Sequence, residues 1–171
     1  MRGARTRRAI ELSCDPAPLF GLILREGSDK FVYMSLHTRH FTLEEARFDL
    51  KSILPDLDKL VDLKRILDGR GYDVYRHRYF GGAGPNGTGH YPPELEELVE
   101  IVKSFDEKGI SVKDLDEGLI DFPHFKENGE EVYLCYKLGE EDILFWHPIQ
   151  SGFSGRRSLK DPDVGRGINE L

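Results

Sequence analysis

Apolar residues recur at alternating spacings of three and four across residues 43–67, which is the pattern of a helix with one packed face. The apolar positions are Leu43, Ala46, Leu50, Ile53, Leu57, Leu60 and Leu67. Thr42 and Glu45 have the spacing of a capping box, so we expect the helix to begin after Thr42. Lys64 interrupts the pattern once, and Pro55, which lacks an amide hydrogen, either kinks one long helix or begins a second one.

A second helical pattern begins at Pro92-Pro93 and ends at Gly109. Its apolar face holds Leu95, Leu98, Ile101, Val102 and Phe105. This helix is shorter than the first run and can pair with it antiparallel, so the two predict a helical hairpin. Residues 72–80 are aromatic and basic, and we expect them to cover the end of the hairpin, whereas the glycine-rich residues 81–89 predict a flexible loop.

In the C-terminal half the apolar period changes to two, which is typical of strands. Asn128-Gly129 is the strongest hairpin signal, and Gly139-Glu140 can serve the next turn. If both loops contain two residues, the segments 118–125, 130–137 and 142–147 form an antiparallel meander. We therefore predict an α+β fold in which a long helical hairpin packs with a small three-stranded antiparallel β-meander.

The pattern divides the chain into three parts. Residues 1–36 are an N-terminal extension, residues 37–159 a single α+β domain, and residues 160–171 a polar mobile tail. Met34 stands directly before the patterned region, so a start site at Met34 would account for the extension. Residues 110–112 allow one further short strand before the meander.

The two-residue loops also fix which side chains share a face of the sheet, because side chains alternate along each strand. His124 then lies on the face opposite to His147, so these two histidines do not share a metal site. Asp121 and His147 lie on the same face. Both faces are apolar at their centres, so the hairpin is expected to cover one, and the N-terminal segment or a second subunit the other.

Composition excludes several classes of protein. The chain has 171 residues and a net charge of −7, which argues against general nucleic-acid binding, although Arg70, Arg76, His77 and Arg78 form a local basic alternative. No apolar run is long enough to span a membrane. The 2 cysteines give neither a disulfide framework nor a metal-type spacing, so a reducing cytoplasmic location is the expectation.

A few polar side chains in the strands are candidates for a site. His147 ends a strand beside a glycine-containing loop, where an imidazole can bind a metal or move a proton. Asp121 lies among apolar residues, so it needs a partner, and Arg156 is the expected one. Glu140 can supply a further carboxylate ligand to a metal. Cys135 stands in mid-strand between aromatic residues, where a cysteine is expected to act as a small apolar group.

Several separated motifs resemble those of a known family. They are Phe41–Ala46 (FTLEEA), Gly118–Pro123 (GLIDFP), Val132–Tyr136 (VYLCY), Gly139-Glu140, Phe145–His147 (FWH), Gly152-Phe153 and Gly155-Arg156. In this order they resemble the prokaryotic Domain of Unknown Function 2203 family, and the resemblance covers residues 41–159. Members typically have Trp where this chain has Tyr136. The resemblance implies a domain boundary and no established activity.

Two functions are consistent with these observations. The first is a non-catalytic scaffold or interaction module that self-associates as a homo-oligomer, or binds another protein, through its helices or a sheet face. The second is a small metal- or ligand-dependent enzyme, such as a hydrolase. Its catalytic candidates are His147, Asp121 and Arg156, and the ligands of its divalent metal would come from His147, Asp121 and Glu140.

Overall fold

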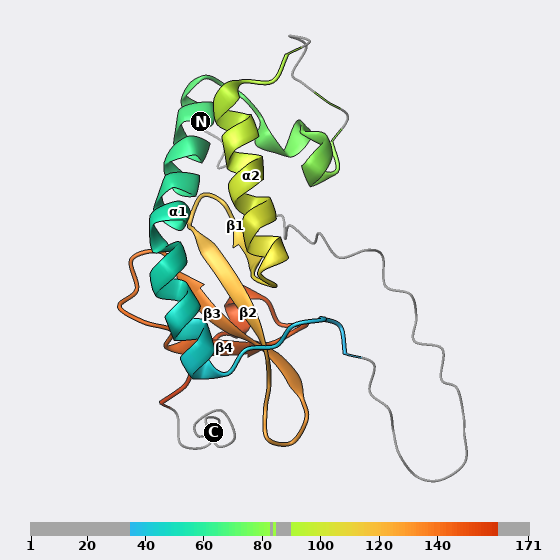
Figure 1. Ribbon diagram of the computed structural model, residues 1–171, viewed down its shortest axis with the longest axis vertical. Coiled ribbons are helices and arrows are strands. Elements are labelled where there is room, and N and C mark those ends of the chain that lie inside the picture. The colour runs from blue at the N-terminus through green and yellow to red at the C-terminus, as the bar shows by residue number, and fades with distance from the viewer. Residues whose placement is uncertain (1–34, 83, 85–89, 161–171) are drawn as a thin grey trace, which may run out of the picture.

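Two helices pack on one face of a five-stranded antiparallel sheet (Figure 1). The computed structural model describes residues 35–82, 84 and 90–160. The proposed Met34 start and nearly all of the predicted N-terminal extension and tail lie outside these residues, as does most of the glycine-rich loop. Within the described part of the chain, no helix is both long enough and apolar enough to cross a membrane.

The predicted helical hairpin is confirmed. Helix α1 (Leu43–Gly69) begins with the expected capping box, in which the Thr42 hydroxyl accepts from the Glu45 amide and the Glu45 carboxylate accepts from the Thr42 amide. The helix runs through Pro55 without ending. Helix α2 (Pro93–Glu107) returns beside it in the opposite direction (Figure 1).

Lys64, the polar break in the apolar pattern of α1, is buried and serves as a clasp. Its ammonium lies 2.6 Å from a carboxylate oxygen of Asp68 on the same helix and 3.0 Å from one of Asp116, which follows the first strand. Burial disfavours the charged lysine, but the hydrogen bonds with both carboxylates outweigh burial and raise the pKa of Lys64. The clasp therefore ties α1 to the sheet.

The aromatic and basic segment after α1 forms two short 3₁₀ helices, η1 (Val74–Arg76) and η2 (Arg78–Phe80). Tyr72 and Val74 are buried in the main hydrophobic core, and the side chains around them pack against it. The Tyr79 hydroxyl donates to the Asp106 carboxylate of α2. This segment is therefore part of the core beside the hairpin.

The prediction of a three-stranded meander is wrong, because the sheet has five strands in the order β1-β2-β3-β4-β5. The strands are β1 (Ser111–Asp114), β2 (Leu119–Phe125), β3 (Glu131–Lys137), β4 (Phe145–Pro148) and β5 (Arg157–Ser158). The short strand allowed at residues 110–112 is β1, which pairs with β2. Strand β5 arises in a segment read as loop, because a strand of two residues has no period of its own.

The predicted register is also wrong by one residue, and the turn explains why. The amide of Gly129 donates to the Lys126 carbonyl over 2.8 Å, and the Lys126 amide donates to the Glu130 carbonyl over 2.9 Å. Gly129 has φ of 80° and is the left-handed residue of a three-residue loop. The extra loop residue places Asp121 opposite Cys135, whereas a two-residue loop would have placed it opposite Tyr136.

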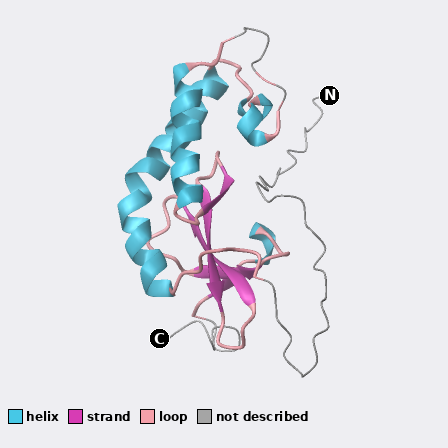
Figure 2. Ribbon diagram, turned by 45° about the vertical axis from the view of Figure 1, so that its right-hand side comes forward, coloured by secondary structure: helices cyan, strands magenta, loops and turns pink. Residues whose placement is uncertain are grey.

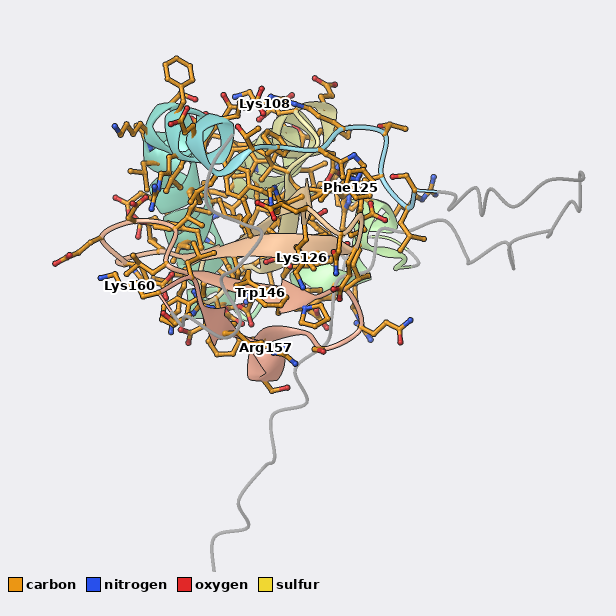
Figure 3. All side chains as sticks on the ribbon, turned by 90° about the horizontal axis from the view of Figure 1, so that it is seen from below. Lys108, Phe125, Lys126, Trp146, Arg157 and Lys160 are labelled. Carbon is orange, nitrogen blue, oxygen red and sulfur yellow. The ribbon has the colours of Figure 1, made fainter. Side chains whose placement is uncertain are left out.

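The face of the sheet toward the helices is apolar. It contributes Ile120, Phe122, Val132, Leu134, Tyr136 and Trp146 to the core shared with α1 and α2. At the end of this face, Lys126 Nζ lies 4.9 Å and Arg157 Cζ 5.3 Å from the Trp146 ring centroid, so two cations cover the indole (Figure 3). His124 shares this face and His147 does not, as predicted.

The opposite face carries the polar residues. Figure 2 shows α1 and α2 on one side of the sheet and the short helix η3 (Phe153–Gly155) on the other. Next to η3, the Arg156 guanidinium lies 4.2 Å from the Phe145 ring centroid. This arrangement corrects the expectation that the second face is apolar at its centre, because its central side chains include Asp121 and His147, both buried.

Candidate functional site

Three buried side chains from three adjacent strands meet at the centre of the polar face. Asp121 of β2 pairs in register with Cys135 of β3, and His147 of β4 is two residues beyond Phe145, the partner of Cys135. One ligand atom from each of Asp121, Cys135 and His147 lies within 4.8 Å of the other two. We call these residues the buried triad.

The imidazole of His147 is held at both nitrogens. Its Nδ1 lies 2.9 Å from the carbonyl oxygen of Pro148, and its Nε2 lies 3.1 Å from Asp121 Oδ2. A carbonyl oxygen only accepts, so Nδ1 carries a proton and Nε2 is the nitrogen directed at the triad. A second proton is then required between Nε2 and the carboxylate, since two lone pairs facing each other would repel.

The pair is best described as an imidazolium beside a carboxylate. Burial favours the neutral ring, but the hydrogen bond with Asp121 and the negative charge of that carboxylate outweigh burial and raise the pKa of His147. The side chains of His147 and Asp121 are only 3% and 1% exposed. The two residues that the sequence singled out as candidates are therefore in direct contact, which the sequence did not specify.

Asp121 has one oxygen left over. Its Oδ2 accepts from His147, whereas Oδ1 is buried and has no hydrogen-bond partner among the residues that the structure describes. Burying a carboxylate oxygen without a partner costs free energy, because the oxygen loses its hydrogen bonds to water and gains none in the protein. Such an oxygen, directed into a cluster of metal-binding side chains, is the feature expected where a cation binds.

Cys135 completes the triad as a neutral thiol. Its side chain is fully buried, and burial together with the negative charge of Asp121 raises the pKa of the thiol above its ordinary value. A neutral thiol is a poor nucleophile. A bound metal ion changes this balance, because it stabilises the thiolate.

The predicted Asp121–Arg156 ion pair is not formed. Arg156 instead pairs with Glu140 over 2.7 Å, and Glu140 also accepts from the Lys137 amide over 2.9 Å. Both contacts are made by Glu140 Oε2, and they hold the carboxylate at the turn after β3, so Glu140 is not part of the triad. Arg156 lies between the rings of Phe145 and Phe153, with its Cζ 4.2 and 5.0 Å from their centroids.

A second polar group adjoins the triad through Tyr133. The Tyr133 ring lies 5.4 Å from the His147 ring, and its hydroxyl lies 2.7 Å from His37 Nε2. Glu131, at the start of the same strand, accepts from the amides of Leu36 and His37 and lies 2.7 Å from His40 Nε2. Glu131 thereby fastens the segment before α1 to the sheet.

Sequence reasoning missed Cys135 as a partner of Asp121, and one signal in the sequence could have found it. Asn128-Gly129 is compatible with a three-residue loop as well as a two-residue one, because Gly can supply the left-handed residue in either. Lengthening the loop by one residue brings Cys135 opposite Asp121. The pairing of Tyr133 with His147 was missed because the β3–β4 register also differs by one residue, with Cys135 opposite Phe145 where two-residue loops would have placed Leu144.

Neither the curated proteins nor the solved structures gave a match to this chain. A family model did. The matched segment of 39–159 includes both helices, all five strands and the whole buried triad, and it agrees with the extent of the resemblance found in the sequence motifs. Because the model described as "Uncharacterized conserved protein (DUF2203)" covers well over half of the 171 residues, the chain belongs to the DUF2203 family.

Proposed function

We propose that this protein binds one divalent transition-metal ion at Asp121, Cys135 and His147, and that Zn²⁺ is the preferred ion. The main observation behind this proposal is the convergence of a carboxylate, a thiol and an imidazole within 4.8 Å, with Asp121 Oδ1 buried and unpartnered among the described residues. Thiolate, imidazole and carboxylate are all ligands of Zn²⁺. The sulfur donor disfavours Mg²⁺ and Ca²⁺, which take oxygen ligands.

The surroundings of His147 support this assignment. In metal sites a ligating histidine donates its other N–H to a carbonyl or carboxylate, which fixes the tautomer and the orientation of the ring. The Nδ1–H of His147 donates to Pro148 O in this way, so Nε2 is the nitrogen free to change its proton for a metal. This replaces the predicted ligand set of His147, Asp121 and Glu140, with Cys135 taking the place of Glu140.

Charge balance supports a divalent ion. In the metal-free protein the buried triad is neutral overall, since it holds a thiol and an imidazolium–carboxylate pair. When the thiol and the imidazolium each lose one proton, the three ligands carry a charge of −2, which a divalent ion cancels. The exchange of one divalent cation for two protons therefore leaves no net charge in the buried sheet face.

The reaction class follows from the number of ligands. Three protein ligands leave a fourth position at a tetrahedral ion, and this is the pattern of catalytic zinc centres, where the bound metal makes water acidic enough to act as a nucleophile. We therefore propose hydrolysis as the chemistry of the centre, with Asp121, Cys135 and His147 as ligands. Arg156 and Glu140 hold the adjoining loop in place.

The test is cobalt substitution with a matched pair of cysteine variants. The chain has 2 cysteines, so Cys14→Ser and Cys135→Ser make the same chemical change. We expect one Co²⁺ or Zn²⁺ per chain, with a thiolate-to-cobalt absorption band that Cys14→Ser retains and Cys135→Ser loses. No saturable metal binding by the unmodified protein, or a band that survives Cys135→Ser, would contradict the proposal.

A separate proposal is that the protein self-associates or binds another protein. Its premise was an apolar sheet face without cover, but that face contains Asp121, Cys135 and His147, all of them buried. Association is supported only by single exposed apolar side chains among the described residues. Two of them are Phe48 on α1, which is 75% exposed, and Phe153, which is 50% exposed. Light scattering at high protein concentration tests it, because a strict monomer would oppose self-association.

A further inference from the structure

A second site lies beside β1, at the end of the helical hairpin. A cavity of about 300 Å³ opens between the segment before α1, the end of η2, the last turns of α2 and strand β1. This volume is at the lower end of the range for small-molecule pockets. Its lining residues are His37, Thr38, Arg39, Phe80, Val102, Asp106 and residues 109–113.

The walls combine apolar and basic groups. Phe80 is partly exposed and offers an apolar surface, on which a flat organic body can pack, whereas Val102, Ile110 and Val112 are buried and offer little surface to a ligand. The charged groups are three basic residues and one acidic residue. Two of these four are committed elsewhere, because Arg39 binds the Asp49 carboxylate and the Lys108 carbonyl, and Asp106 accepts from the Tyr79 hydroxyl.

None of these contacts involves Lys113, so its ammonium group can interact with a ligand in the cavity. It stands at a break in the β1–β2 register, where Val112 and Asp114 pair with neighbouring residues Ile120 and Leu119. Lys113 is therefore the extra residue of a β-bulge, a device that redirects a side chain. Its ammonium lies 4.6 Å from the Tyr133 ring centroid, and it forms no ion pair with a carboxylate among the described residues.

We propose that this cavity binds a small organic anion, with the Lys113 ammonium as the counter-ion of its carboxylate or phosphate group and the Phe80 side of the cavity as the surface for its apolar body. Among the described residues Lys113 is in no ion pair, and its charge also acts on Asp106 in the cavity wall. The partly exposed Phe80 favours an anion that carries a flat or branched hydrocarbon over inorganic phosphate. This inference does not depend on a metal at the buried triad.

The cavity lies at the β1 edge of the sheet, with α2 and η2 on one side, and two of its lining residues pair with or contact residues of the face that carries the triad. Ser111, in the cavity wall, pairs in register with Asp121, and Lys113 reaches the Tyr133 ring that contacts His147. An anion held by Lys113 would therefore sit next to the triad across Tyr133. Occupation of the two sites can be measured separately, because one takes an anion and the other a cation.

The experiment compares four probes on the full chain: benzoate, its neutral isostere benzamide, phenyl phosphate and inorganic phosphate. Binding is followed by amide chemical shifts in a heteronuclear NMR titration, in metal-free buffer. We expect benzoate or phenyl phosphate to saturate with a dissociation constant of about 1 mM or tighter, with shifts at Gly109, Ser111 and Lys113. The better of the two identifies the head group, and benzamide should bind about tenfold more weakly.

Two lysine variants separate the site from the overall charge of the protein. Lys113→Met should weaken binding of the better anion about tenfold, whereas Lys51→Met, the same change at an exposed position of α1, should alter it less than about twofold. Failure of both organic anions to saturate below about 10 mM would overturn the proposal. Equal binding of benzamide, or unchanged binding by a folded Lys113→Met variant, would also overturn it.

Discussion

The pair of Asp121 and His147 can be tested by a double-mutant cycle in metal-free protein. The variants are Asp121→Val, His147→Leu and the two combined. In His147→Leu the Asp121 carboxylate is left 1% exposed without its imidazole partner, and Oδ1 has no partner among the described residues even in the intact pair. We expect this variant to lose about 3–5 kcal/mol of unfolding free energy, the usual cost of leaving a buried charge unpaired.

The other single variant should cost less. In Asp121→Val the imidazole can release its second proton and become neutral, so the loss is that of one hydrogen bond with a buried nitrogen left unsatisfied, about 1–3 kcal/mol. The double variant removes both polar groups and replaces them with apolar ones. We expect it to be at least as stable as His147→Leu, so that the two residues show a coupling free energy of about 2 kcal/mol or more.

The assay is urea denaturation at neutral pH in the presence of a chelator. With a slope of about 2 kcal/mol per molar urea, a loss of 4 kcal/mol lowers the midpoint by about 2 M. The exposed pair of Lys59 and Glu97, whose side chains are 52% and 47% exposed, is the control, and breaking it should leave the midpoint almost unchanged. Single losses at Asp121 and His147 that add to the double loss within about 0.5 kcal/mol would refute the argument.

Three further predictions concern the metal, a turn and a buried histidine. Zinc titration by calorimetry in buffers of different ionisation enthalpy should show about two protons released per ion, and a value near zero would contradict the charge balance of the triad. Gly118→Ala should destabilise the protein by about 1–3 kcal/mol more than Gly129→Ala in thermal melts. Both glycines have positive φ, of 59° and 80°, but an added Cβ would lie 2.7 Å from a neighbouring side chain only at Gly118; equal losses would refute this. Burial lowers the pKa of His124 despite its hydrogen bond to the Phe41 carbonyl, so the unfolded chain takes up a proton first and stability falls as pH drops below about 6.5. Denaturation at several pH values should show this loss in the unmodified protein and less of it in His124→Gln, and parallel pH curves would exclude it.

The helices and the candidate residues were accessible from the sequence because their signals are local. The alternating spacing from Leu43 to Leu67, the capping box at Thr42 and the glycine at 109 each act within a few residues, and each produced the structure expected. His147 and Asp121 were recognisable as candidates by residue type and position alone. Asp121 and His124 take opposite faces because side chains alternate along one strand, whereas His147 of β4 shares the face of Asp121 because the β2–β3 and β3–β4 registers each differ from the prediction by one residue and the two shifts cancel.

The contacts within the sheet were decided by tertiary structure. The sequence Asn128-Gly129 permits a hairpin loop of two or of three residues. One additional loop residue moves every cross-strand partner between β2 and β3 by one position. Strand β5 forms because its two residues pair with β4. The loop between these strands places Arg156 beside Glu140. The sequence by itself determined the two helices, the segments that form β2 and β3, and which polar side chains need partners. Only the packed sheet decided that Asp121 meets Cys135 and His147, because partners across strands are set by register, which is a property of the whole sheet.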